Sequence, residues 1–327
     1  MIRAILMPLR LAAVLLVLCV TIPAMLALVG FAVPLFDIFN HLQILLFFGT
    51  LAATLLVLVL RMGRVWAALA LVGLAASGWT FVPEWLSSLA PRAPGTDAAT
   101  VTVMTHNVFG RNYDIDRVSQ AIGAVDPDIV ALQEFFPEQQ GLGKLLQARY
   151  PYSVRCQGGK RANLGLYSKL PFDTEMAARD CPSNARGGQR TAHIAVKFTL
   201  PDGTSFSVMT THMDWPYPVE RQRDQLAAAA EIANNIAGPL AVVGDFNSTP
   251  WSYALKGFEA ATGLRRETRN LVTFPELWTM PDGLVRLSPF LPLDHVFQRG
   301  LLVSALGTGP QTGSDHLPVV FTFTVAR

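Results

Sequence analysis

The chain has 327 residues, of which 51% are hydrophobic and only 15% are charged. An average soluble domain carries about 25% charged residues, so the composition argues against a protein that is soluble throughout. Residues 1–95 hold five Lys and Arg and two Asp and Glu, whereas residues 96–327 hold 21 and 22. The second part is therefore close to neutral, which removes any argument for nucleic-acid binding by bulk positive charge.

Three long apolar runs without formal charge fill the first part, at Leu11–Phe36, Ile38–Leu60 and Val65–Pro83. Each is about as long as the roughly 20 residues that a helix needs to cross a bilayer. We therefore predict an all-α anchor of three transmembrane helices over residues 1–86, which contacts the lipid bilayer through residues 11–83. A cleaved signal peptide followed by buried helices is the alternative, but a signal peptide would be followed by polar mature chain.

The positions of the basic residues predict the orientation of this anchor. Arg3 and Arg10 precede the first run, and Arg61 and Arg64 separate the second from the third. Loops rich in Lys and Arg stay in the cytoplasm, so three crossings place the chain after Trp85 on the other side. We expect a multi-pass protein of the inner (cytoplasmic) membrane with a periplasmic or extracellular domain.

Two cysteines, Cys156 and Cys181, lie 25 residues apart in the second part of the chain. A disulfide between them requires an oxidising compartment, which the predicted orientation supplies. Two unrelated thiols are the alternative, and the sequence leaves both open.

A polar, proline-containing stretch, 87–99, predicts a linker before a globular domain over residues 100–327. Strand-like and helical patterns alternate within this domain. The strand-like runs are Val101–Asn107, Asp128–Glu134, Thr191–Leu200, Thr204–His212, Leu240–Asp245 and Leu317–Val325, and the helical ones are Asp116–Val125 and Val219–Ile236. Paired strands mixed with helices predict an α+β domain of sheets covered by helices.

Residues able to bind metal or move protons follow or precede these strands directly. They are Asn107, Glu134, His212, Asp245, Asn247, Asp294, Asp315 and His316. Carboxylate and amide oxygens dominate and no thiolate is among them, which favours Mg²⁺ or Mn²⁺ over structural zinc. Each residue alone is typical of a turn, a helix cap or a surface pair. Their joint occurrence at strand ends predicts one site.

These residues lie in six short motifs, THN, DIVALQE, TTHMD, GDFNSTP, LDHVF and GSDHLPV. Over Val101–Val325 the sequence resembles the endonuclease/exonuclease/phosphatase superfamily. The resemblance implies a four-layered sandwich, two packed sheets flanked by helices. It also implies metal-assisted attack of water on a phosphate ester.

The resemblance assigns the metal to three residues. Glu134 corresponds to the principal ligand, Asp315 contacts the metal, and Asn107 supports either the metal or a phosphate oxygen. Repair-type members carry a second acid two residues after the asparagine, where this chain has Phe109. A two-metal arrangement of the repair type is therefore not implied.

The resemblance assigns the catalytic chemistry to five further residues. His316 acts on the attacking water or stabilises the phosphoryl group, and Asp294 orients its ring. Asp245 is the alternative base for the water. Asn247 and His212 contact phosphate oxygens.

Two phosphate-ester substrates remain open, nucleic acid and a lipid headgroup, and a phosphatase activity on monoesters is also compatible. Another hypothesis is a non-catalytic, membrane-tethered binding module, which the complete set of site residues disfavours. Four aromatic residues could rim a substrate groove, touch the membrane surface or, as we expect for at least half of them, pack in the interior: Trp215, Tyr217, Phe274 and Trp278. The sequence predicts no organic cofactor and indicates no protein partner.

Overall fold

The computed structural model describes residues 2–92, 99–183, 191–280 and 283–326. It divides into two compact units. The helical unit contains Met1–Leu89 and Thr249–Lys256, and the sandwich unit contains Ala90–Ser248 and Gly257–Arg327. The predicted linker, 87–99, remains a prediction, because its residues 93–98 lie outside the described parts of the chain.

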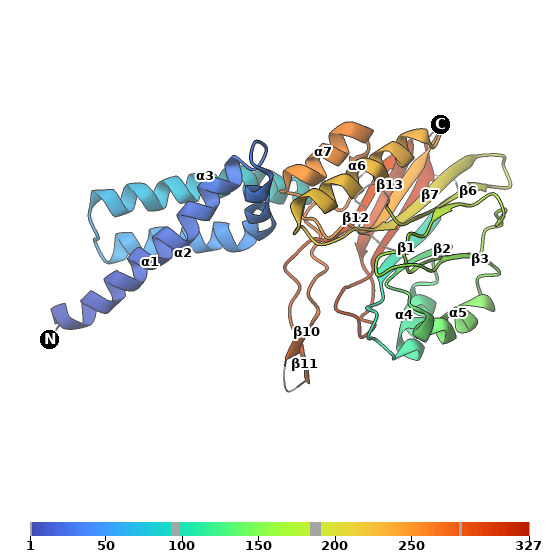
Figure 1. The fold of residues 1–327 in the computed structure, drawn as a ribbon, viewed down its shortest axis with the longest axis horizontal. Helices are drawn as coiled ribbons and strands as arrows, with labels where there is room; N and C mark the ends of the chain where they lie inside the picture. The colour runs from blue at the N-terminus through green and yellow to red at the C-terminus, as the bar shows by residue number, and fades with distance from the viewer. Residues whose placement is uncertain (1, 93–98, 184–190, 281–282, 327) are drawn as a thin grey trace. The chain divides into compact units, whose positions relative to one another are not determined.

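The helical unit consists of three long helices and a short 3₁₀ helix (Figure 1). They are α1 (Ile2–Leu28), η1 (Pro34–Leu42), α2 (Gln43–Val59) and α3 (Arg64–Leu89). The first apolar run was expected to be helical to Phe36, but α1 ends at Leu28. Val33 is extended, with φ −121° and ψ 95°, because Pro34 disfavours helical backbone in the residue before it.

Small residues bring the three helices close together. A Cβ on Gly73 of α3 would lie 2.4 Å from the Thr21 hydroxyl of α1, and the hydroxyls of Thr50 and Ser77 are hydrogen-bonded at 2.8 Å. Such small-residue contacts are typical of helix packing in membranes. Large apolar side chains such as Trp79, 81% exposed, point away from the bundle. By length and composition, Met7–Leu28, Pro34–Val59 and Arg64–Leu89 are candidate membrane spans.

Asp37, which the sequence places between the first two apolar runs, is buried within the helical unit. Its carboxylate accepts hydrogen bonds from the backbone N–H groups of Tyr253 (2.8 Å) and Ala254 (3.0 Å). These are the first residues of α7 (Tyr253–Thr262). Asp37 therefore provides an acceptor for two backbone donors of the segment Thr249–Lys256, which belongs to the same unit.

The sandwich unit contains two six-stranded sheets and a separate hairpin, β10 (Leu277–Met280) with β11 (Gly283–Arg286). The first sheet has the order β13 (Leu301–Thr308), β14 (Val319–Val325), β1 (Val101–Asn107), β2 (Ile129–Gln133), β4 (Leu164–Ser168), β3 (Tyr152–Cys156). The second has the order β5 (Ala178–Asp180), β6 (His193–Thr199), β7 (Ser205–His212), β8 (Leu240–Asp245), β12 (Asp294–Arg299), β9 (Arg265–Arg266).

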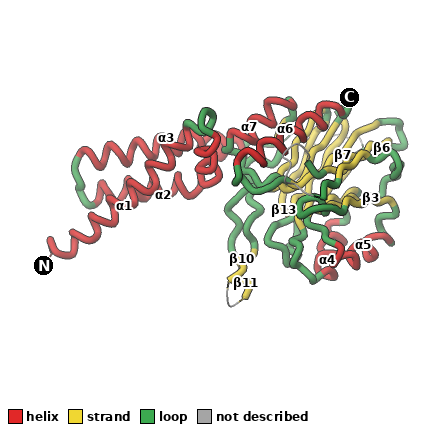
Figure 2. Tube along the Cα trace, in the orientation of Figure 1, coloured by secondary structure: helices red, strands yellow, loops and turns green. Residues whose placement is uncertain are grey.

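Helices cover the outer faces of both sheets (Figure 2). The helices α4 (Ile115–Val125) and α5 (Gln140–Gln147), with η2 (Pro137–Gln139) before α5, lie on the first sheet, and α6 (Val219–Asn235) and α7 lie on the second. The predicted α+β four-layered sandwich is therefore confirmed. The predicted strands and helices of this part are also present, with ends shifted by at most two residues.

Side chains of the central strands point alternately to the two faces of the sheet, and this produces two hydrophobic cores. Ile129 and Ala131 of β2 face the second sheet. Val130 and Leu132 belong to a separate core with side chains of α4 and α5. Because both faces of the strand are covered, its sequence is apolar at every position from Ile129 to Leu132 rather than at every second one.

Gly244 allows β7 and β8 to approach closely beside the end of β8. Its φ is +142°, and a Cβ there would lie 2.0 Å from the carbonyl oxygen of Thr211. A side chain at this position would meet both backbone strain and a backbone clash, so only glycine is accommodated.

We predict that Gly244→Ala lowers the free energy of unfolding by roughly 1–3 kcal/mol, the cost of a strained backbone position. The matched control is Gly257→Ala in α7, where a Cβ has no neighbour within 4 Å and alanine should stabilise the helix by about 1 kcal/mol. Thermal unfolding of the full chain in detergent measures both. Equal stability of Gly244→Ala and wild type would contradict the close approach.

Candidate active site

One parallel and one antiparallel strand pair bring the predicted site residues of the second sheet to one edge. In the register of this sheet, His212 at the end of β7 lies beside Asp245 at the end of β8. Asp245 in turn lies opposite Asp294 at the start of β12. Three strands therefore place one histidine and two carboxylates side by side.

The first sheet contributes the remaining predicted residues at the same edge. Asn107 ends β1, Glu134 follows β2, which is parallel to β1, and Asp315 and His316 precede β14, which is antiparallel to β1. The Asn107 Nδ2 donates a hydrogen bond to Oδ2 of Asp245 at 2.9 Å. This bond joins the two sheets across the site.

The Asp245 carboxylate is the centre of this arrangement. Its Oδ1 accepts from the backbone N–H of Asn247 at 2.8 Å. Its Oδ2 lies 3.5 Å from Nε2 of His212 and 3.7 Å from Nε2 of His316. Burial alone would raise the pKa of Asp245, but His316, His212 and the bond from Asn107 lower it below the usual value. Asp245 is therefore held ionised in the interior.

His316 is paired with Asp294 on its other side. Its Nδ1 donates to Oδ2 of Asp294 at 2.7 Å, and the same oxygen accepts from the Thr273 hydroxyl at 2.6 Å. The Phe274 ring lies 4.8 Å from the imidazole, centre to centre. Burial would lower the pKa of His316, but Asp294 and Asp245 raise it to about 10. The ring therefore lies between two carboxylates, bonded to Asp294 through Nδ1 and with Nε2 3.7 Å from Oδ2 of Asp245.

Glu134 and Asp315 face a cavity of about 470 Å³, with Trp215 on its wall. Oε2 of Glu134 accepts from the backbone N–H of Gly110 at 2.9 Å. Burial raises the pKa of Glu134, but His212, this bond and Arg161 lower it overall. Burial, assisted by Glu134 and Asp245, raises the pKa of Asp315 to about 6. Carboxylates this close together at one cavity repel one another, and a bound cation would reduce this repulsion.

Two residues that carry oxygen ligands have left-handed backbone, Glu134 with φ 52° and Asn247 with φ 46°. Non-glycine residues adopt this conformation rarely, and it concentrates at functional sites. Oδ1 of Asn247 is also buried without a hydrogen-bond partner among the described residues. An unsatisfied oxygen beside carboxylates fits a hard divalent cation or its water.

Geometry also groups donor atoms of Asp245, Asp294 and His316 within 4.8 Å of one another. This cluster differs from the ligands assigned by resemblance, Glu134, Asn107 and Asp315. Asp294 is already engaged by His316 and Thr273, whereas Glu134 and Asp315 face the cavity. The cavity-facing set is therefore the better fit for a metal that also binds substrate.

Arg161 is a site residue that the sequence analysis missed. It is 5% exposed, and its Nη1 lies 3.4 Å from Oε1 of Glu134 and 2.6 Å from Nε2 of His212. Its Nε donates to Oδ1 of Asp214 at 3.0 Å. Arg161 shortly precedes β4, which is antiparallel to β2, so the topology places it at the site edge. The sequence analysis selected carboxylate, amide and imidazole side chains as possible ligands and therefore did not include an arginine.

The aromatic residues left open by the sequence divide between surface and interior. Trp215 is 44% exposed and lines the cavity, and Tyr217 is exposed. Phe274 is buried between Trp215 and His316. The side chain of Trp278 lies outside the described parts of the chain.

The sequence was compared with known protein families and with individual proteins. A model described as the Endonuclease/Exonuclease/phosphatase family matches residues 104–316. A UPF0294 protein of Vibrio cholerae is 32% identical over 131 residues, which cover 40% of this chain and 44% of that protein. The chain therefore matches less than half the length of this relative.

Two solved structures share the fold of the sandwich unit. D. rerio TDP2 complexed with a single-strand DNA product has a TM-score of 0.55 and 15% identity, covering 70% of this chain and 100% of that chain. A mannosyl-6-phosphatase of Bacteroides thetaiotaomicron has a TM-score of 0.53 and 17% identity, covering 68% and 99%. Identities this low show similarity of fold alone.

Two fully buried histidines lie next to the site without belonging to it. Nε2 of His106 is hydrogen-bonded to the Thr312 hydroxyl at 2.8 Å, and Nε2 of His295 to the Ser248 carbonyl at 2.7 Å. Burial lowers the pKa of each imidazole to about 3. Both rings are therefore neutral in the folded protein well below the pH at which they are protonated in the unfolded chain.

We predict that these histidines make the fold acid-sensitive. Because the unfolded chain binds their protons below about pH 6.5 and the folded chain does not, stability falls as the pH drops. Between pH 6.5 and 5.5 each contributes about 1 kcal/mol to this fall. Urea unfolding of wild type and His295→Gln at both pH values measures it. The fall should be smaller by about 1 kcal/mol in the variant, and an equal fall would contradict the burial of a neutral His295.

Proposed function

The chain belongs to the endonuclease/exonuclease/phosphatase family, and on that basis we propose that it is a metal-dependent phosphoesterase that hydrolyses a phosphodiester. Family membership supports a hydrolase acting on phosphate esters. The observation that carries the proposal is the convergence of Asp245, the His316–Asp294 pair and Glu134 at one strand edge. These are the groups that in-line attack of water on phosphorus requires.

Glu134 and Asp315, supported by Asn107, would hold Mg²⁺ or Mn²⁺. Both carboxylates line the cavity, and carboxylates with phosphate oxygens are the usual ligands of these ions. When bound, the metal would polarise a phosphate oxygen and lower the pKa of the attacking water.

The chain's own residues account for proton movement and charge. We assign to His316, which is paired with Asp294 through Nδ1, the stabilisation of negative charge on the phosphoryl group through Nε2. Asp245 is ionised and lies 3.7 Å from that nitrogen. We therefore assign to Asp245 the role of the alternative base that the resemblance implies, which takes the proton of the attacking water. Asn247 and His212, which lie beside Asp245, would contact the phosphate oxygens as the resemblance implies.

Short or single-stranded nucleic acid is the substrate class that we favour. The partly exposed Trp215 beside the two cavity carboxylates offers a face on which a base stacks. The near-neutral composition of residues 96–327 disfavours long duplexes, which are held chiefly through phosphate neutralisation. TDP2, similar in fold, was solved with a single-strand DNA product.

A lipid headgroup phosphodiester is the second candidate. The three candidate membrane spans favour it, because a tether at the bilayer raises the local concentration of lipid substrate. A non-catalytic binding module is disfavoured by the intact set of charged and hydrogen-bonded residues around Asp245.

We predict hydrolysis of bis-p-nitrophenyl phosphate by the full chain in detergent micelles, and its loss on addition of EDTA. Plasmid DNA, single-stranded DNA, sphingomyelin and p-nitrophenyl phosphate identify the substrate class. His316→Ala and Glu134→Ala should lower kcat/KM by roughly 10²–10⁴-fold, because each removes a group that acts in the transition state.

The matched controls are His193→Ala, a histidine of β6 bonded to the Thr191 carbonyl, and Glu175→Ala, an exposed acid. Both should retain wild-type rates. Activity that survives His316→Ala and Glu134→Ala, or that persists in EDTA, would remove the proposed site.

We also propose that the sandwich unit lies on the extracytoplasmic side of the membrane. Arg3, Arg10, Arg61 and Arg64 support this orientation through the positive-inside rule. The disulfide between Cys156 and Cys181 supports it independently, because such bonds persist in oxidising compartments.

Reporter fusions after Arg327 test the orientation. We predict that alkaline phosphatase, which is active only outside the cytoplasm, is active there, and that a cytoplasm-dependent fluorescent protein is dark. The opposite pair of results would place the catalytic domain in the cytoplasm.

A further inference from the structure

Arg161 reaches the site from a compact loop, Gln157–Asn163, that connects β3 to β4. Within this loop the backbone N–H of Ala162 and the side-chain amide of Asn163 both donate to the Gly159 carbonyl, at 2.9 and 3.0 Å. The loop turns tightly around this one oxygen. Where the loop is held therefore decides where the Arg161 guanidinium lies.

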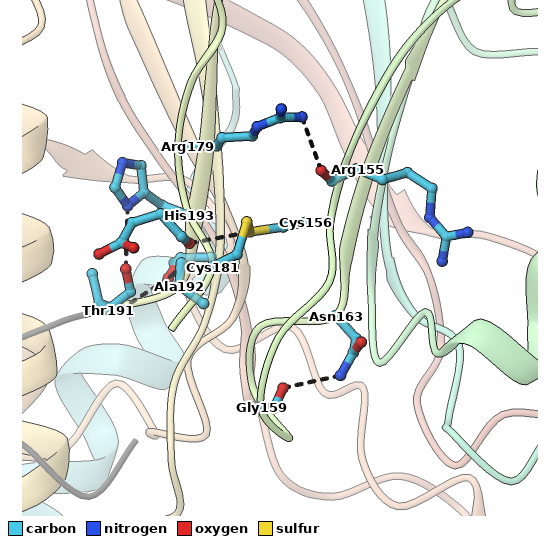
Figure 3. The surroundings of a disulfide bond; sticks show 11 residues. Arg155, Cys156, Gly159, Asn163, Arg179, Cys181, Thr191, Ala192 and His193 are labelled. Atoms are coloured by element: carbon cyan, nitrogen blue, oxygen red, sulfur yellow. Dashed lines mark hydrogen bonds between the residues drawn. A yellow bond between two sulfur atoms is a disulfide. The ribbon is translucent and has the colours of Figure 1, made fainter. Parts of the chain in front are cut away.

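A disulfide holds the start of this loop (Figure 3). Cys156, the last residue of β3, is bonded to Cys181, which follows β5 directly, and their Cα atoms are 5.3 Å apart. Because β3 and β5 are edge strands of different sheets, the bond ties the two sheets together at one side of the sandwich. It is a covalent link between the layers immediately beside the loop of Arg161.

The loop packs backbone to backbone on the chain that follows Cys181. The Gly159 N–H donates to the Pro182 carbonyl at 2.8 Å. A Cβ on Gly158 would lie 2.7 Å from the Cys181 carbonyl oxygen, and one on Gly159 would lie 2.6 Å from that of Ser183. This fit requires both glycines, and the disulfide keeps the two segments in contact.

The position of Arg161 has consequences for two site residues. Its Nη1 lies within hydrogen-bonding distance of Nε2 of His212, at 2.6 Å. The same nitrogen lies 3.4 Å from Oε1 of Glu134, while Gly110 holds the other oxygen at 2.9 Å. Arg161 thus contacts both the ring of His212 and the carboxylate of Glu134 and restricts the orientation of each.

We propose that Arg161 is a positioning residue for Glu134 and His212, and that the Cys156–Cys181 disulfide holds it there, making activity sensitive to reduction. The proposal rests on the proposed phosphoesterase function. A dithiol would reduce the bond, giving two cysteine thiols and an oxidised dithiol with transfer of two electrons and two protons. The loop would then lose its covalent tie while both hydrophobic cores remain.

The first test is Arg161→Gln in the full, oxidised chain, with bis-p-nitrophenyl phosphate as substrate. Loss of a group that orients a metal ligand costs roughly 10- to 100-fold, and the loss should fall on kcat with KM nearly unchanged. The matched control is Arg179→Gln, because Arg179 lies beside the same disulfide but donates to the Arg155 carbonyl. A raised KM with wild-type kcat would overturn the positioning role.

The second test is the coupling between the arginine and the disulfide. Dithiothreitol treatment, and the Cys156→Ser/Cys181→Ser double variant, should each lower kcat roughly 10-fold or more. Adding Arg161→Gln to the double variant should cost little further, because both changes remove the same interaction. If the losses in kcat of Arg161→Gln and the double cysteine variant multiply when combined, or if kcat is unchanged after reduction, the coupling between Arg161 and the disulfide is contradicted.

Hydrogen exchange provides a readout that does not depend on activity. Reduction should speed exchange of amides in residues 157–163 while those of β1 and β2 stay protected. Unchanged exchange in the loop would contradict the role of the disulfide. If oxidised wild type hydrolyses none of the esters, the proposed function fails, and this measurement still decides whether the disulfide holds the loop.

Discussion

The hydrogen bond from Asn107 to Asp245 is the interaction on which the site depends. It joins the end of β1 in the first sheet to the end of β8 in the second, at 2.9 Å. Every other predicted group takes its place relative to these two strand ends: Glu134 through β2, His212 through β7 and Asp294 through β12. A rigid double sheet thus provides the precision that side chains on loops alone would lack.

Charge is the second constraint. The carboxylates of Glu134, Asp245 and Asp315 meet in a largely buried space, and His316 and Arg161 are among the basic side chains that lie beside them. Like charges in the interior are costly unless they are paired. Burial and the neighbouring carboxylates raise the pKa of Asp315 to about 6, which reflects this unfavourable energy. A divalent cation and a substrate phosphate would complete the balance of charge.

The fold and most residues of the candidate site could be predicted from the sequence, because each prediction depends on a short stretch of chain. Runs such as those around Val103 and Val243 are buried on both faces, and polar groups follow them directly. Arg161 could not be found this way, because its role depends on a loop held by a residue 20 positions away, Cys181. The early end of α1 at Leu28 was missed because hydropathy continues past the backbone break before Pro34.

The central claim is that one hard cation binds between Glu134 and Asp315, facing the cavity. Anomalous diffraction from crystals grown with Mn²⁺ tests it most directly. The account predicts a peak within about 2.3 Å of an oxygen of both carboxylates, as expected for a small divalent ion. A peak confined to the Asp245–Asp294–His316 cluster, or no peak with the ion present in excess, would contradict it.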